Sequence, residues 1–293
     1  MWSKFKGTGV AIVTPFGKDL TVDYQGLGNL VDHLINGGVD YLVVQGTTGE
    51  SATLTNKEKA SVLNFVYERV AGKIPLVMGI GGNNTAAVAE AFQTFDTDKF
   101  EAILSVCPYY NKPNQEGLYQ HYKYLSERSP KPIILYNVPG RTSCNLTAAT
   151  TLRLAHDFNN LIAIKEASGN LDQIGKIIKD RPDNFLVISG DDALTVPMIS
   201  IGANGVISVV ANAFPVQFTK MVNAALKPDF LTAQKLHLSL IEITELMFRE
   251  GNPAGVKAAL EILKVSGKEV RLPLVSLSGS LYKEMEQAIN KLP

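Results

Sequence analysis

Residues 132–165 read PIILYNVPGRTSCNLTAATTLRLAHDFNNLIAIK, and the pattern in this stretch decides the fold. Its two ends, PIILYNV and LIAIK, are short apolar runs that predict strands, and the segment between them is long enough for a helix. Strands that are apolar almost throughout are typical of a parallel sheet covered by helices on both faces. We therefore interpret the stretch as one strand-helix-strand unit.

The same unit recurs along the chain. Six further apolar runs predict strands, and they are GVAIVT from Gly9, VDYLVV from Val39, IPLVMGI from Ile74, AILSVC from Ala102, FLVIS from Phe185 and GVISVV from Gly205. Eight such units in about 220 residues predict an α/β fold of the closed (β/α)8 TIM-barrel type. A doubly wound open sheet is the main alternative, but it more often has five to seven strands.

The segments between the runs carry helix signals. In residues 23–38 the apolar residues recur at helical spacing, and Thr55 with Glu58 can form a capping box at the start of the helix that follows the second strand. No strand is expected after Pro215, where helices are interrupted by GNP (251–253) and RLP (271–273). We predict a barrel over residues 1–225 and a C-terminal helical extension over residues 226–293.

Composition narrows the class of partner. Apolar residues make up 45% of the 293 residues, and the 28 basic residues equal the 28 acidic ones. With no net charge, no binding to nucleic acid or to an anionic membrane is expected, so small molecules or copies of the chain are the expected partners.

Cysteines, histidines and the N-terminal residues bear on metal binding and on the cellular location. Cys107 and Cys144 form no CxxC motif, and the four histidines are scattered, so no metal is expected. The first apolar run ends at Thr14 and Pro15 and is too short for the apolar region of a signal peptide or for a membrane span. These features predict a cytoplasmic protein.

Polar loops follow six of the predicted strands. They are GTTGES (46–51), GIGGNN (79–84), CPYYNKP (107–113), YNVPGRT (136–142), KEASGN (165–170) and SGDD (189–192). In a TIM barrel these loops meet at the carboxyl ends of the strands, where active sites of this fold lie. GIGGNN lacks both the Walker lysine spacing and the full GxGxxG pattern, so it is a weak phosphate-loop candidate.

Lys165 is the sharpest candidate, because it ends a strand that is otherwise apolar. Burial disfavours the charged form of a lysine and lowers its pKa, so the neutral amine can attack a carbonyl. The alternative is a structural lysine paired with Glu166 or another acid. Successive strand residues point to opposite faces, so Lys165 and Glu166 should not share a side, and we assign no role to Glu166.

Other candidates surround Lys165 on the predicted rim, each with a structural alternative. Tyr136 could pass protons or simply satisfy a backbone carbonyl. Thr47 and Thr48 could bind a carboxylate or only form a turn. Arg141 suits bidentate carboxylate binding, although an isolated loop arginine is more often merely solvated. The pair Asp191 and Asp192 suggests capping of the next helix rather than a metal site.

Six segments, in their order and spacing, resemble those of a known family: GTTGES, PYYNKP, YNVPGRT, IKEASGN, SGDD and GANGVISV. With NPAGVKAAL and RLPL, the similarity runs from Gly7 to about Leu274. The sequence resembles the dihydrodipicolinate synthase family of the N-acetylneuraminate lyase superfamily of Schiff-base aldolases. Such an enzyme is expected to condense pyruvate with L-aspartate 4-semialdehyde in lysine and diaminopimelate biosynthesis, with no cofactor.

The resemblance implies roles for four catalytic residues. Lys165 would form an imine with the keto carbon of pyruvate. Tyr136, Thr47 and Tyr110 correspond to the proton relay of the family, in which Tyr110 reaches across from a neighbouring subunit. Relatives are commonly tetramers built from tight dimers, so a homotetramer is expected.

The resemblance also implies four substrate-binding residues. Thr48 would hold the pyruvate carboxylate and Arg141 the semialdehyde carboxylate, while Gly190 and Ile207 would line the site through backbone groups. Arg141 favours a synthase over the alternatives, an N-acetylneuraminate lyase or another sugar-acid aldolase. A non-catalytic ligand-binding barrel is a further alternative, but binding alone needs no amine nucleophile.

One departure from the family concerns its feedback site for lysine. Two histidine positions of that site read Asn56 and Lys59, and a glutamate position reads Ala87. The positions that remain are Ser51, Leu54, Asn83 and Tyr109. Losing an acid and gaining a cation weakens attraction for an amino acid with two cationic groups, so weak or absent inhibition by lysine is expected.

Overall fold

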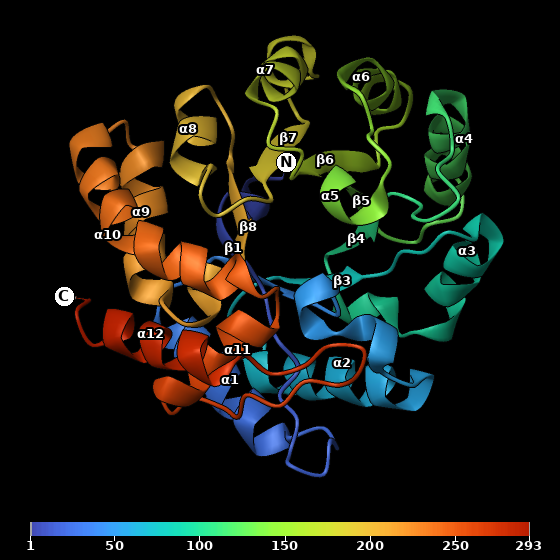
Figure 1. The fold of residues 1–293 in the computed structure, drawn as a ribbon. Helices are drawn as coiled ribbons and strands as arrows, with labels where there is room; N and C mark the ends of the chain where they lie inside the picture. The colour runs from blue at the N-terminus through green and yellow to red at the C-terminus, as the bar shows by residue number, and fades with distance from the viewer. Residues whose placement is uncertain (1, 293) are drawn as a thin grey trace.

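The computed structural model describes residues 2–292, and its centre is a closed barrel of eight parallel strands. The strands pair in chain order, and the last pairs with the first. Their bounds are β1 Gly7–Ala11, β2 Tyr41–Val44, β3 Leu76–Gly79, β4 Ala102–Val106, β5 Ile133–Asn137, β6 Leu161–Glu166, β7 Leu186–Ser189 and β8 Gly205–Ser208. Figure 1 shows the helices arranged around this barrel. The predicted TIM barrel is confirmed.

Helices follow the strands in the predicted alternation. Those that precede the extension are α1 Tyr24–Asn36, α2 Asn56–Val70, α3 Thr85–Thr94, α4 Gln115–Ser126, α5 Pro139–Thr142, α6 Ala148–Asp157, α7 Leu171–Asp180, α8 Thr195–Ser200 and α9 Pro215–Leu226. The start of α2 is the predicted capping box, because the Thr55 hydroxyl accepts from the Glu58 N–H and the Glu58 carboxylate accepts from the Thr55 N–H.

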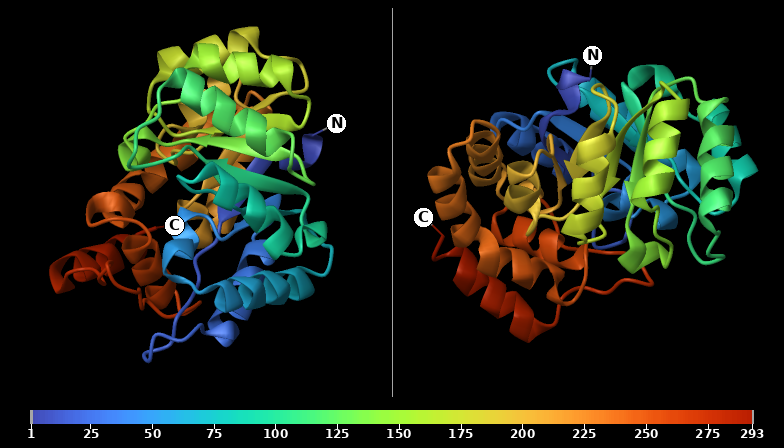
Figure 2. Two further views of the ribbon diagram at one scale, coloured as in Figure 1. Left: turned by 90° about the vertical axis from the view of Figure 1, so that its right-hand side faces the viewer. Right: turned by 90° about the horizontal axis from the view of Figure 1, so that it is seen from above.

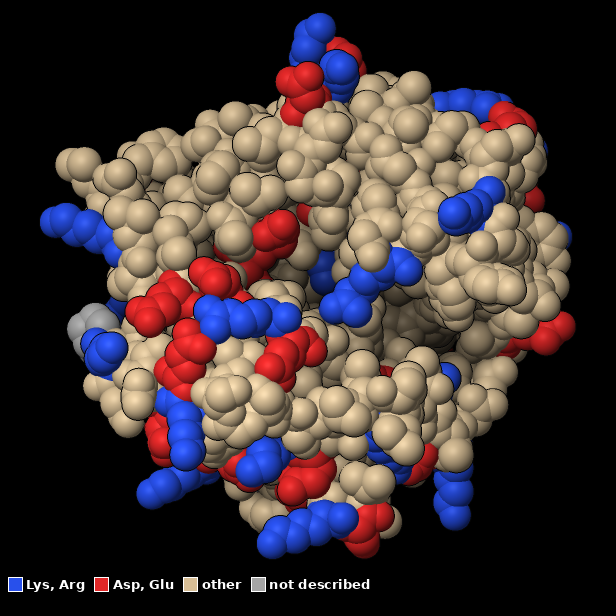
Figure 3. Space-filling model, in the orientation of Figure 1, with Lys and Arg blue, Asp and Glu red and all other residues tan. Residues whose placement is uncertain are grey.

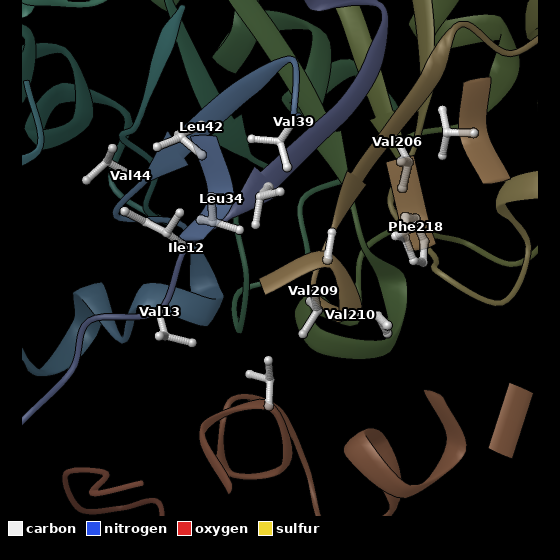
Figure 4. Close-up of a cluster of buried hydrophobic side chains, with 14 of the residues drawn as sticks. Ile12, Val13, Leu34, Val39, Leu42, Val44, Val206, Val209, Val210 and Phe218 are labelled. Atoms are coloured by element: carbon white, nitrogen blue, oxygen red, sulfur yellow. The ribbon is translucent and has the colours of Figure 1, made fainter. Parts of the chain in front are cut away.

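The core has two layers, one inside the barrel and one between the barrel wall and the helices. Tyr41 and Val43 of β2 pack inside, whereas Leu42 and Val44 pack outward with Leu34 of α1. Figure 4 shows part of the outer layer, in which side chains from β2, α1 and β8 lie together. Because both faces of each strand are buried, the strands read as continuous apolar runs.

A glycine makes room for a tyrosine ring inside the barrel. A Cβ atom at Gly9 would lie 2.2 Å from the Tyr41 ring, which is fully buried. Any side chain at Gly9 would therefore displace the ring from the interior.

Three helices follow α9 and form the predicted C-terminal extension: α10 Phe230–Arg249, α11 Ala254–Ile262 and α12 Gly279–Ile289. Figure 2 shows them at the end of the barrel away from the N-terminus. Helix α10 packs on α8 and α9, and α11 contacts the turn η5 (Val210–Asn212) just after β8. The extension therefore lies beside the carboxyl ends of the strands, while the division at residues 225 and 226 stays a prediction. Over residues 2–292, no helix combines the length and apolar character needed to cross a bilayer.

Candidate active site

A cavity of about 980 Å³ opens where the strands end. Its wall combines the rim loops of the barrel with α10 and the two residues before α11, and Figure 3 shows that face of the molecule hollowed at its centre, with charged side chains around the opening. The polar and charged groups that line it include Thr47, Thr48, Tyr136, Arg141, Lys165, Asp191, Asp192 and Asn252. The loops after β2, β5, β6 and β7 therefore converge as predicted.

Lys165 and Tyr136 lie side by side at the base of the cavity. They are register partners in β6 and β5, and the Lys165 Nζ atom lies 4.3 Å from the centroid of the Tyr136 ring. Burial lowers the pKa of Lys165 to about 8; the charge of Asp192 raises it, and that of Arg141 lowers it. Part of the Lys165 population is therefore neutral near pH 8, which a nucleophilic amine requires.

Burial acts on Tyr136 in the opposite sense. It raises the pKa of the phenol to about 12, although the Arg141 charge and the Thr47 side chain each lower it. Tyr136 is therefore a protonated hydroxyl next to an amine, an arrangement suited to passing a proton.

Gly190 leaves space for the stem of Lys165. A Cβ atom at position 190 would lie 3.1 Å from both Cγ and Cε of Lys165 and 2.8 Å from Cβ of Ala167. The predicted site residue Gly190 thus contacts the lysine itself, because the chain after β7 runs against β6.

The loop after β2 contains both predicted threonines. Thr47–Gly49 form the turn η2, in which Thr47 is exposed and Thr48 is buried. The Thr48 hydroxyl accepts a hydrogen bond of 3.0 Å from Asn252 Nδ2. Sequence patterns did not identify Asn252 as a site residue, since it lies 204 positions from Thr48 in the GNP segment that signalled only a helix break.

Arg141 lies on the short helix α5 at the mouth of the cavity. Its side chain is exposed, and Nη2 donates to the backbone carbonyl of Asn252 at 3.5 Å. Arg141 is therefore in reach of solvent and of the cavity at once, as a carboxylate-binding group at the entrance must be.

Glu166 points away from Lys165, as the alternation of strand residues predicts. Its carboxylate accepts hydrogen bonds from Asn137 Nδ2 at 3.1 Å, from the Ser168 N–H at 2.8 Å and from Gln173 Nε2 at 3.3 Å. Burial raises the pKa of Glu166, and the hydrogen bonds from Ser168 and Asn137 lower it. Glu166, for which the sequence predicted no role, thus joins β5, β6 and α7 behind the site.

The prediction that the two aspartates cap the next helix is wrong, because no side chain caps α8. Asp191 accepts from the N–H groups of Ala193 and Leu194 in the turn before the helix. Asp192 is instead buried, and it accepts from the Ser208 hydroxyl and the Val209 N–H at the end of β8. Because β7 pairs with β8, Asp192 lies beside these donors, and the local sequence does not reveal that neighbourhood. Burial raises its pKa to about 6.

Two of the predicted catalytic and substrate-binding residues, Tyr110 and Ile207, do not line the cavity of this chain. Tyr110 is 88% exposed and has a φ of 74°, a strained backbone conformation for a bulky residue. Ile207 is 1% exposed and packs inside the barrel on β8. Among residues 2–292, no cluster of three or more His, Cys, Asp or Glu side chains could hold a metal ion.

The positions that correspond to the family's feedback site for lysine lie around one side of the cavity. Ser51, Lys59 and Tyr109 line it, and Asn83 Nδ2 donates to the Tyr109 carbonyl at 3.2 Å. The remaining positions lie nearby in the chain: Leu54 is buried, Asn56 begins α2, and Ala87 lies in the first turn of α3.

Comparison with known proteins identifies the family of the chain. The sequence model of the dihydrodipicolinate synthetase family matches residues 4–292. A 4-hydroxy-tetrahydrodipicolinate synthase of Parabacteroides distasonis is 50% identical over 98% of this chain and 97% of its own, and one of Flavobacterium psychrophilum is 52% identical over 96% of each chain. A crystal structure of dihydrodipicolinate synthase from Aquifex aeolicus superimposes with a TM-score of 0.94 at 40% identity, covering 99% of both chains. The chain therefore belongs to the dihydrodipicolinate synthetase family.

Proposed function

We propose that this chain is a Schiff-base lyase that condenses pyruvate with L-aspartate 4-semialdehyde to form 4-hydroxy-tetrahydrodipicolinate in lysine and diaminopimelate biosynthesis. The observation that carries the proposal is Lys165, a buried amine with a pKa lowered to about 8 that lies over Tyr136 in the mouth of a TIM barrel. A lysine of this kind suits imine formation with a carbonyl substrate.

The reaction begins when the neutral Lys165 amine attacks the keto carbon of pyruvate. Water leaves and an imine forms, which makes the pyruvate methyl group acidic. Loss of a methyl proton gives an enamine, whose carbon attacks the aldehyde while the new alkoxide takes up a proton. The amino group of the adduct then attacks the imine carbon, the ring closes, and Lys165 leaves as the free amine.

The substrate contacts follow from the lining of the cavity. Thr48 holds the pyruvate carboxylate, and Arg141 at the entrance holds that of the semialdehyde. Gly190 shapes the site through its backbone, while the backbone role of Ile207, which packs inside the barrel below the cavity, stays a prediction from the family resemblance. An exposed guanidinium at the mouth favours an amino-acid aldehyde over the uncharged tail of a sugar acid, which supports the synthase over a sugar-acid lyase.

Protons pass along Tyr136, Thr47 and Tyr110. The first two line the cavity of one chain, while Tyr110 is exposed beside it, as a residue that serves the site of a neighbouring copy would be. We therefore propose a homotetramer made of two dimers, with each dimer completing its own pair of sites. The free thiols of Cys107 and Cys144 support a cytoplasmic location.

The test of the function uses chemical trapping and turnover together. Borohydride with pyruvate should reduce the imine and leave the added group on Lys165, as located by peptide mass spectrometry. Wild type should form product from pyruvate and the semialdehyde but leave sialic acid uncleaved. Lys165→Ala should form no product and carry no label. Trapping at another lysine, or turnover by Lys165→Ala, contradicts the proposal.

Regulation by lysine is proposed to be weak. Lys59 lines the cavity at a position where the family has a histidine, and Ala87 supplies no carboxylate for an ammonium group. In a lysine titration, the purified enzyme should keep most of its activity at lysine concentrations that fully inhibit the lysine-sensitive relatives. The variant Ala87→Glu should increase the inhibition if the lost acid is the cause, because it restores an attractive charge.

A further inference from the structure

A buried ion pair lies behind the loop that contains Thr47 and Thr48. Lys257 of α11 donates to Glu50 Oε1, and the two side chains are 0% and 1% exposed. Lys257 also donates to the Glu269 carbonyl at 2.8 Å, and the second carboxylate oxygen of Glu50 accepts from the Arg271 N–H at 3.0 Å. Glu50 is thus held at both of its oxygens by the C-terminal extension.

An ion pair at this depth is a poor way to gain stability alone. Removing two charges from water costs several kcal/mol per ion, and apolar pairs of similar volume are often as stable. Burial lowers the pKa of Lys257 to about 8, although Glu50 raises it. A pair that costs this much calls for a role in fixing a conformation.

The pair fixes the conformation of residues 47–50, the threonine loop after β2. Glu50 ends the turn η2 with a φ of 51°, and its N–H donates to the Thr47 carbonyl at 3.1 Å. A left-handed backbone at a glutamate is costly, so the loop needs outside support to keep it. The carboxylate of Glu50, held from α11, provides that support.

The C-terminal extension contacts the loop at a second point, just before α11. Asn252, two residues before α11, donates to the Thr48 hydroxyl, while Lys257 in the first turns of α11 holds Glu50. The extension therefore fastens the loop at a hydroxyl and at a carboxylate two residues apart.

We propose that Lys257 and Glu50 are positioning residues for the reaction, whose buried ion pair keeps the Thr47–Thr48 turn in the shape that binds the carboxylate of the first substrate. The inference rests on the proposed function, in which that carboxylate belongs to pyruvate. The C-terminal extension is then part of the substrate site, because it controls the shape of the turn that binds the substrate. Neither Lys257 nor Glu50 has to touch the substrate for this effect.

The experiment compares Lys257→Met and Glu50→Gln with the control Lys268→Met. Lys268 pairs with Glu261 at 2.8 Å in the same extension, but its side chain is 39% exposed and does not contact the threonine loop. Steady-state kinetics are measured with each substrate varied in turn. We expect the KM for pyruvate to rise about tenfold in both test variants while kcat changes little, the pattern of lost substrate binding. The control should match wild type.

A purely structural pair would behave differently. Partial unfolding lowers the apparent kcat with the amount of folded enzyme and leaves the pyruvate KM unchanged, and that result overturns the inference. A rise confined to the KM of the semialdehyde overturns it as well. If Lys257→Met does not fold, Glu50→Gln decides alone, since it keeps the shape of the side chain.

Borohydride trapping separates this inference from the function on which it rests. Wild type labelled by pyruvate at Lys165, together with an unchanged pyruvate KM in the variants, rejects the positioning role and leaves the function standing. Wild type without label at Lys165 rejects both. Label on Lys257 instead of Lys165 also rejects both, because the positioning lysine would then be the nucleophile.

Discussion

Lys165 is an amine whose burial in the barrel mouth lowers the stability of the folded chain. Its folded-state pKa of about 8 lies below the ordinary lysine value of 10.5, so between these pH values the folded chain binds fewer protons than the unfolded chain. Stability therefore rises with pH across that interval, and the full cost is present below pH 8. At 1.36 kcal/mol per pKa unit, that cost is about 3 kcal/mol.

Replacing the lysine should remove this cost. We expect Lys165→Met to unfold at a higher temperature than wild type at pH 7, with the difference shrinking as the pH approaches 10.5. Thermal unfolding followed by circular dichroism measures it. Lys179→Met, at a lysine whose side chain is 80% exposed, should show no such gain. Equal stability of Lys165→Met and wild type at pH 7 would show that the lysine carries no burial cost.

Gly190 offers a second prediction for a single residue. The methyl group of Gly190→Ala would press on the Lys165 stem and on Ala167 at distances that force a shift. We expect imine formation with pyruvate to slow by about tenfold or more, because small misplacements of a reacting group are costly. Rapid-mixing measurements of trapped imine provide the rate.

A glycine with open space around it is the matched control. An added Cβ at Gly175 in α7 has no neighbour within 4 Å, so Gly175→Ala should keep the rate and gain up to about 1 kcal/mol of helix stability. Equal rates for the two alanine variants would mean that the lysine stem moves aside freely.

Two adjacent register pairs explain how neighbouring strands build the site. Tyr136 pairs with Lys165 on the cavity side, and Asn137 pairs with Glu166 on the helix side. The outer pair is joined by hydrogen bonds from Asn137 Nδ2 to the carboxylate, so it holds β5 and β6 in the register that the inner pair needs.

We expect Glu166→Leu to destabilise the fold by about 3 kcal/mol or more, because it leaves buried donors on Asn137, Ser168 and Gln173 without acceptors. Urea unfolding measures the loss. Glu68→Leu, at an exposed position of α2, changes the same residue type without such donors and should cost far less. Similar losses for the two variants would contradict a stabilising role of the network.

The strands and the direction of Lys165 were predictable because both depend on local periodicity. Apolar runs give the eight strands, with ends displaced by up to three residues, and alternation places Lys165 and Glu166 on opposite faces. The acceptor role of Glu166 was not predictable, since Asn137 and Gln173 lie on other elements. Sequence alternation gives the side on which a residue lies but not the residues that meet it.

At the scale of the molecule, the missed contacts join distant parts of the chain. Glu50 and Lys257 are 207 positions apart, and Thr48 and Asn252 are 204 apart. They meet only because the barrel closes and the extension returns to the rim where β2 ends. A glutamate and a lysine read one at a time are ordinary surface residues, so their burial as a pair could not be deduced from composition or spacing.

The position of Tyr110 yields a prediction for the assembly. It is 88% exposed and does not line the cavity of its own chain, so we expect it to act in the site of a partner copy. Tyr110→Phe and Lys165→Ala should each be severely impaired alone. In a hybrid dimer, however, the Tyr110→Phe chain keeps its lysine and receives an intact tyrosine from the Lys165→Ala chain, which completes one site.

Equal amounts of the two variants, unfolded and refolded together, should therefore recover about a quarter of wild-type activity, because random pairing in two-fold dimers gives half of the lysine-bearing chains a tyrosine-bearing partner. Each variant refolded alone is the control, and native mass spectrometry reports whether hybrids form. If hybrids form without any gain in activity, Tyr110 does not act across the interface. Full activity of Tyr110→Phe alone would remove the tyrosine from the proton relay altogether.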